Sequence, residues 1–151
     1  MTSDGAVALQ VALEANDRER RRLVLLVASL DEAALAEGVH GRWTVAAKLA
    51  HLAYWDRWAS GEDYTTDALP DFYDDTLNDA QLAEHLALLP REAARLAVGA
   101  AEAIDARLHA LPAEAAVSLL TDRDASWLLR RHNHRAEHLV EIDLALGLRG
   151  C

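Results

Sequence analysis

Apolar residues recur at helical spacing along most of this chain, and they mark four long segments. Ala, Leu, Glu and Arg, which are all good helix formers, dominate the composition. The first predicted helix runs from about Ser3 to Leu30, with an apolar stripe that includes Val7, Val11, Leu23, Leu26 and Val27. The second begins after Trp43 and ends near Ser60, and it is apolar on almost every side. We therefore expect the second helix to be largely buried.

Capping residues and glycines set the expected ends of the elements in the first half of the chain. Asp31 is placed to cap a short helical turn over residues 31–37, which Gly38 would stop. Thr44 is a suitable cap for the second helix, and Gly61 follows its end. A polar connection is predicted over residues 62–77.

Two prolines divide the second half of the chain. Asn78 can cap a third helix that reaches about Leu111, and Pro90 would kink or divide that helix. Residues 112–121 are ambiguous and could form a short helix. A fourth helix is predicted to run to about Leu146, with Asp122 or Asp124 as its cap and Gly147 as its stop.

The prediction is an all-α protein in which residues 1–151 form a single domain, a four-helix bundle. The 151 residues suffice for one sizeable core. With 7 Gly and 3 Pro, the chain has too few turn residues for a fold of many strands. We see no internal repeat and no low-complexity linker.

The charge of the chain limits its partners. The formal net charge of −10 disfavours binding to nucleic acid or to an anionic membrane. Eight carboxylates and no Lys or Arg lie between Glu62 and Glu84; a solvated connection explains them best, and a docking surface for a basic partner is the alternative. No apolar run approaches about 18 residues, and the first residues lack the basic and apolar regions of a secretory leader, so we expect neither a membrane span nor a signal peptide. The single cysteine, Cys151, suits a reducing compartment, so we expect a cytoplasmic protein.

Three histidines are the candidate chemical centre. His134 and His138 stand four residues apart, so a helix places both imidazoles on one face. His51 on the second helix could complete the set, whereas His132 points to the opposite side of its helix. Three protein ligands with an open position are typical of a catalytic metal site. The alternative is that His51 is a satisfied core histidine and that the later histidines belong to an exposed basic face.

Aromatic and cationic residues share the faces of these histidines and form the predicted substrate-binding set. Trp55 and Trp58 lie on the stripe of His51, while Trp127 and Arg131 lie on the stripe of His134. Arg131 could hold a carboxylate of a substrate, or it could pair with Glu141 or with an acid on another helix.

The string from His134 to His138 also matches the inverted zinc-protease pattern H-x-x-E-H, with Glu137 as the base. That class needs a third ligand well downstream, and none of the thirteen residues after His138 is a histidine. A position of Glu137 near the metal, outside the ligand set, stays open.

Two motifs resemble the DinB-like (DinB/YfiT-like) superfamily of metalloenzymes: Trp43-Thr-Val followed by His51-Leu-x-x-Trp55-Asp, and His134-x-x-x-His138-Leu-x-Glu. The resemblance extends over nearly the whole chain in helix order and length. It implies a four-helix bundle of the DinB type, a homodimer, and one divalent metal, zinc or nickel, held by His51, His134 and His138. It further implies chemistry with a small thiol such as mycothiol or bacillithiol.

The leading hypothesis is a metal-dependent thiol S-transferase or isomerase that acts on a small-molecule substrate. Metal-assisted hydrolysis with Glu137 or Glu141 as the base is the alternative enzyme. A non-enzymatic stress-response or ligand-binding dimer is the third possibility.

Overall fold

The computed structural model describes residues 2–61 and 75–148, and helices form most of that part of the chain. The helices are α1 (Ser3–Ser29), α2 (Glu32–Ala36), α3 (Val45–Ala59), α4 (Asp75–Ala87), α5 (Pro90–Ala110), α6 (Ala113–Thr121), α7 (Ser126–Leu129) and α8 (Arg131–Ala145). Two short strands, β1 (Gly38–His40) and β2 (Trp43–Thr44), complete the described structure. The prediction of a mainly helical protein is confirmed.

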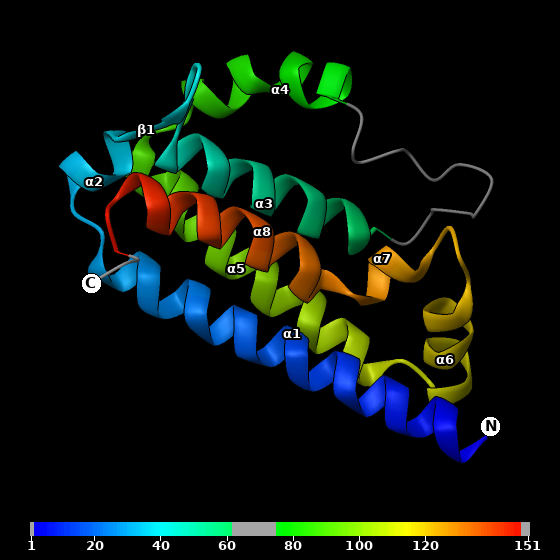
Figure 1. Ribbon diagram of the computed structural model, residues 1–151. Helices are drawn as coiled ribbons and strands as arrows, with labels where there is room; N and C mark the ends of the chain where they lie inside the picture. Colours follow the sequence, from blue (N-terminus) through cyan, green and yellow to red (C-terminus); the bar gives the residue numbers. More distant parts are fainter. Residues whose placement is uncertain (1, 62–74, 149–151) are drawn as a thin grey trace.

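Four long helices, α1, α3, α5 and α8, lie side by side and form the body of the molecule (Figure 1). α3 packs against both α5 and α8, while α1 packs against α5 and α8 from the other side. α4 covers α3, and α6 lies near the first turns of α1 (Figure 1). The burial predicted for the second helix is confirmed, because 12 of the 15 residues of α3 are buried.

The sequence pattern did not predict the two strands. β1 and β2 form an antiparallel pair in which Gly38 faces Thr44 and His40 faces Trp43. Gly41 adopts a φ of +51° in the turn between them, a conformation that favours glycine. The hairpin places Trp43 two residues before the start of α3.

Several predicted caps are confirmed. The Asp31 carboxylate accepts a hydrogen bond of 2.8 Å from the Ala34 amide, and the Thr44 hydroxyl accepts one of 3.1 Å from the Ala47 amide. Gly147, with a φ of +68°, follows the last helix where its stop was expected.

The third predicted helix is divided, as one of the two expectations for Pro90 allowed. α4 ends at Ala87 and α5 begins at Pro90, because a proline is tolerated in the first turn of a helix but not in its interior. The assignment of Asn78 as a helix cap was wrong. Asn78 lies inside α4, where its side-chain oxygen accepts a hydrogen bond of 3.2 Å from the Trp55 indole.

The end of the chain also differs from the single helix expected after residue 122. Residues 113–121 form α6, and the Asp122 carboxylate accepts hydrogen bonds from the backbone amides of Asp124 and Ala125 in the turn before α7. α8 starts at Arg131, and its first turn is capped from another helix. The Asn16 side chain of α1 accepts a hydrogen bond of 2.8 Å from the His132 amide and donates one of 2.7 Å to the Leu129 carbonyl.

Two expectations fall wholly or partly on residues that are not described. Residues 62–74 of the acidic stretch and Cys151 lie outside the described residues. Within the described part of the chain, no helix is both long and apolar enough to cross a membrane.

Candidate metal centre

The three predicted ligand histidines converge although 83 residues separate His51 from His134. His51 comes from the middle of α3, and His134 and His138 come from successive turns of α8. The Nε2 atom of His134 lies 3.1 Å from Nε2 of His51 and 3.1 Å from Nε2 of His138. All three side chains are buried, and one nitrogen from each lies within 4.8 Å of the others.

These separations fit one shared metal ion. Two imidazole nitrogens bound tetrahedrally to zinc at about 2.0–2.1 Å lie about 3.3 Å apart. The observed 3.1 Å is close to that value. Each neutral imidazole has a single N–H, so three Nε2 atoms that face one another can form few hydrogen bonds among themselves. The arrangement therefore suits a group that accepts three lone pairs at once.

Burial keeps the imidazoles of His51 and His134 in the neutral form that can bind a metal. Burial lowers the pKa of His51 to about 2, and positive charge at His138 and Lys48 acts in the same direction. Burial also lowers the pKa of His134 well below its ordinary value, reinforced by His138 and Arg131. Two of the three candidate ligands thus stay unprotonated at neutral pH.

Glu141 sets the orientation of His138, a role that its sequence position alone did not reveal. Nδ1 of His138 lies 2.8 Å from Oε2 of Glu141, and the same oxygen lies 3.0 Å from Nζ of Lys48. Burial opposes the ionisation of Glu141, but the two hydrogen bonds outweigh it and lower its pKa to about 2. Because a carboxylate only accepts, His138 carries its proton on Nδ1 and turns Nε2 toward the other histidines.

Lys48 is the only lysine of the chain. Its ion pair with Glu141 explains how a cation can lie beside the histidines. Its ammonium group is buried, pairs with Glu141, and lies 4.7 Å from the centre of the Trp43 ring. The Glu141 carboxylate therefore neutralises a cation that would otherwise repel a metal ion.

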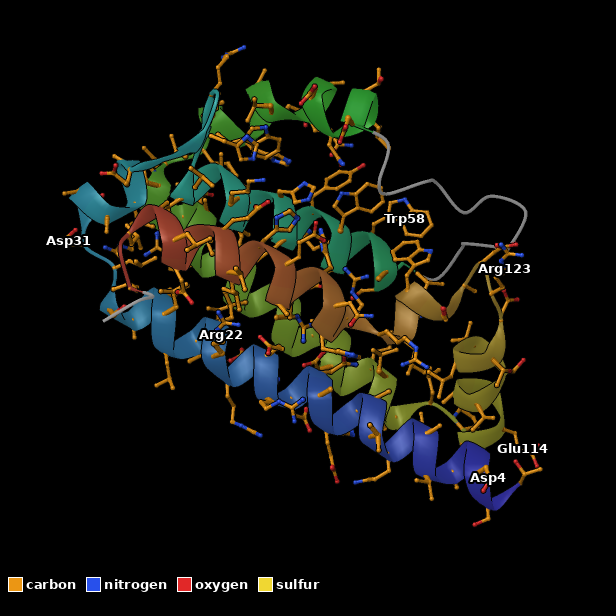
Figure 2. All side chains as sticks on the ribbon, viewed as in Figure 1. Asp4, Arg22, Asp31, Trp58, Glu114 and Arg123 are labelled. Atoms are coloured by element: carbon orange, nitrogen blue, oxygen red, sulfur yellow. The ribbon has the colours of Figure 1, made fainter. Side chains whose placement is uncertain are left out.

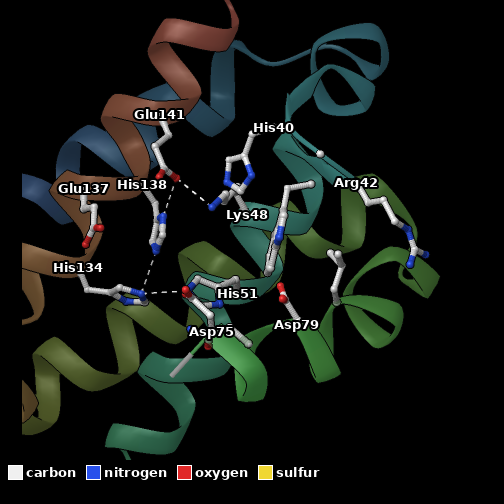
Figure 3. Close-up of a pocket in the computed structure, with 14 residues that line it drawn as sticks. His40, Arg42, Lys48, His51, Asp75, Asp79, His134, Glu137, His138 and Glu141 are labelled. Atoms are coloured by element: carbon white, nitrogen blue, oxygen red, sulfur yellow. Dashed lines mark hydrogen bonds and ion pairs between the residues drawn. The ribbon is translucent and has the colours of Figure 1, made fainter. Parts of the chain in front are cut away.

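A pocket with a volume of about 690 Å³ opens onto the histidines (Figure 3). The β1–β2 hairpin, α3, α4 and α8 supply its walls, which are His40, Gly41, Arg42, Trp43, Lys48, His51, Asp75, Asn78, Asp79, Leu82, His134, Glu137, His138 and Glu141. In this wall the indole of Trp43 lies edge-on to the His51 ring, with the two ring centres 5.5 Å apart. Sequence reasoning missed this neighbour, although Trp43 precedes the helix that carries His51.

The predicted substrate-binding tryptophans form a cluster of their own. Trp55, Trp58 and Trp127 lie with ring centres 5.7–6.2 Å apart, and Trp58 extends from the last turns of α3 toward α7 (Figure 2). Among the described residues, none of the three belongs to the wall of the histidine pocket. Their role in substrate binding stays a prediction.

Arg131 pairs with an acid on another helix, as one of its expected roles allowed. Its side chain is fully buried. Its Nε donates a hydrogen bond of 2.8 Å to Oδ1 of Asp56, and one Nη donates a hydrogen bond of 3.0 Å to the Trp127 carbonyl. Arg131 does not line the pocket. The proposed contact with a substrate carboxylate stays untested.

Asp56 belongs to a buried ionic network that joins the main helices. Arg135 of α8 donates hydrogen bonds of 2.8 Å and 2.9 Å to the two carboxylate oxygens of Asp105 on α5. It donates a further hydrogen bond of 3.3 Å to Asp56 on α3. Arg20 of α1 donates another hydrogen bond, of 3.0 Å, to Asp105. Since Arg131 and Arg135 flank His134 on α8, the network fixes the rotation of α8 that turns His134 and His138 toward α3. A separate ion pair joins α1 to α8: Arg22, which is labelled in Figure 2, donates a hydrogen bond of 2.7 Å to Asp143.

His132 points away from the other histidines of α8, as expected, and its Nδ1 lies 3.0 Å from the Asn16 side chain on α1. His85 on α4 was not singled out in the sequence, yet it is buried with its ring centre 6.2 Å from that of His51. The result is a buried group of three histidines that could hold a metal ion. Compared with protein-family models, with curated proteins and with solved structures, the chain matches none of them.

Proposed function

We propose that this chain is a DinB-like metalloprotein that holds one divalent ion, zinc or nickel, between His51, His134 and His138. The convergence of three Nε2 atoms in a buried group carries this proposal. The position of Glu141 supports it, because metal-binding histidines commonly donate their other ring N–H to a carboxylate.

We further propose that the site activates a small thiol for transfer to an electrophilic substrate. An ion at the three histidines would hold such a thiol as its thiolate near neutral pH. The thiol proton leaves to solvent, and the sulfur forms a bond to an electrophilic carbon. The leaving group departs with the bonding electron pair and takes up a proton from solvent. Trp43 and Leu82 give the pocket apolar surface for such a substrate.

Metal-assisted hydrolysis is the second candidate, and the contacts of its two candidate bases favour Glu137 over Glu141. Glu141 is held by both His138 and Lys48, so it is poorly placed to take a proton from a reacting water. Glu137 lines the same pocket, and its side chain makes no hydrogen bond or ion pair with any described residue. A hydrolytic mechanism would therefore use Glu137 as its base.

Elemental analysis of protein purified without a histidine tag tests the metal site. We expect about one equivalent of zinc or nickel in the wild type, the same in the exposed control His109→Ala, and little in His134→Ala. A metal-free wild type, even after incubation with both ions, contradicts the proposal, and so does a His134→Ala variant that keeps its metal.

A second experiment tests the reaction and the assembly. Metal-loaded protein that conjugates none of a panel of small thiols with model electrophiles leaves a metal site without the transferase function. Light scattering tests the homodimer that the resemblance to the DinB-like superfamily implies. A non-enzymatic binding dimer would hold a ligand in this pocket and turn over neither thiols nor hydrolysable substrates.

A further inference from the structure

Besides Glu141, three carboxylates stand around the histidines in the pocket wall. Asp75 and Asp79 come from α4, and Glu137 comes from α8. Figure 3 shows Glu137 on the side of His134 and His138, and the two aspartates on the opposite side, toward His51. A molecule that reaches the histidines therefore passes between acidic groups on both sides.

These carboxylates lack partners within the described part of the chain. No hydrogen bond or ion pair joins the side chain of any of the three to another described residue. α4 contains no Lys or Arg that could pair with its own aspartates. They are thus available to a ligand.

The basic side chains of the pocket do not compensate for them. The Lys48 ammonium is already paired with Glu141. Figure 3 shows Arg42 at the far side of the pocket from Glu137. With neutral histidines, the four carboxylates and two basic side chains of the wall leave a formal charge of −2.

From this distribution we infer that the pocket takes a ligand that carries a cationic group, of the ammonium type, beside the anionic atom that meets the metal. This inference rests on the proposed function, because it assumes a divalent ion at the histidines. That ion balances the charge of the wall, and an anionic donor then returns the pocket to a net negative charge. A cationic group on the same ligand restores neutrality, whereas a second anionic group would face three unpaired carboxylates.

Three thiols of matched length test the inference on protein loaded with Co²⁺. Thiocholine carries a quaternary ammonium group that cannot chelate the metal, 2-mercaptoethanol is neutral, and 3-mercaptopropionate is anionic. Thiolate-to-cobalt charge-transfer absorption, measured per bound cobalt, gives the Kd of each thiol. The comparison uses the wild type, Asp79→Asn, Glu137→Gln and the control Glu84→Gln, which alters an exposed residue of α4 outside the pocket wall.

The ratio of the Kd of 3-mercaptopropionate to that of thiocholine is the readout, because intrinsic differences between the thiols cancel when variants are compared. A unit charge about 6 Å away in water-like surroundings changes each Kd by about threefold, so removal of one carboxylate should lower the ratio by about tenfold. Glu84→Gln should leave the ratio unchanged, and added salt should reduce it in the wild type.

Equal ratios in the wild type, Asp79→Asn and Glu137→Gln overturn the inference and leave the metal site intact. Tighter binding of 3-mercaptopropionate than of thiocholine, with no response to either substitution, does the same. A protein that binds no cobalt at the histidines overturns both the inference and the proposed function.

Discussion

Replacement of Glu141 by Gln should weaken metal binding even though Glu141 is not itself a ligand. One oxygen of the carboxylate lies 2.8 Å from Nδ1 of His138, from which it accepts a hydrogen bond, and 3.0 Å from Nζ of Lys48, with which it forms an ion pair. A glutamine keeps the shape of the side chain but loses the charge. It therefore no longer raises the basicity of His138, and it no longer neutralises the lysine.

The magnitude follows from these two contacts. Loss of a carboxylate that orients a metal-binding histidine typically lowers metal affinity about 10–100-fold, which corresponds to about 1.4–2.7 kcal/mol. The Lys48 side chain is only 6 % exposed, so its charge is poorly screened by water once Glu141 is gone. We therefore expect a loss near the upper end of that range.

Competition for zinc between the protein and a chelating dye measures the effect at neutral pH, with circular dichroism as a check of folding. The double variant Glu141→Gln and Lys48→Met should bind zinc more tightly than Glu141→Gln alone, because it also removes the unpaired cation. Glu137→Gln is the matched control, and it should change the affinity by no more than about threefold, since it removes only a nearby charge. Wild-type affinity in Glu141→Gln would refute the assigned role of this carboxylate.

Two further predictions concern the folded state. Asp56→Asn should lower the free energy of unfolding by about 3–5 kcal/mol in urea titrations, because it leaves a buried arginine charge unpaired, whereas Glu32→Gln at an exposed ion pair should cost less than about 1 kcal/mol. Addition of Arg131→Met to Asp56→Asn should recover part of the loss, and a further loss of similar size would contradict the network as described. The metal-free protein should become less stable as the pH falls below about 6.5, because the unfolded chain then binds protons that the buried His51 and His134 exclude. A urea midpoint that stays constant or rises between about pH 7.5 and 5.5 would show that this proton linkage is absent.

Helix positions followed from local sequence because their signals act over one or two turns. Asp31 and Thr44 cap the helices that they precede, and Gly147 follows the last one. Pro90 divides α4 from α5 for the same local reason, its missing amide proton. Asn78 has a side chain suited to capping, but the Trp55 indole of α3 donates a hydrogen bond to it from another helix, and no local pattern signals that contact.

The shared face of His134 and His138 was also readable from sequence, since helical periodicity alone determines it. That His51 would meet them was an expectation from the two motifs together, and the structure brings the three side chains into one group. Sequence periodicity could not show which aromatic ring would stand beside His51. Helical spacing favoured Trp55 and Trp58, but the hairpin places Trp43 there.

The sequence by itself therefore determined the helices, their caps and the histidine pair, because these depend on contacts between residues close along the chain. Only the tertiary structure decided that Glu141 joins Lys48 to His138, that Asp56 binds Arg131, and that carboxylates of α4 and α8 surround one pocket. Those arrangements depend on how α3, α4 and α8 are rotated and packed against one another. Packing of buried groups from distant segments sets that rotation, and no local pattern in the chain encodes it.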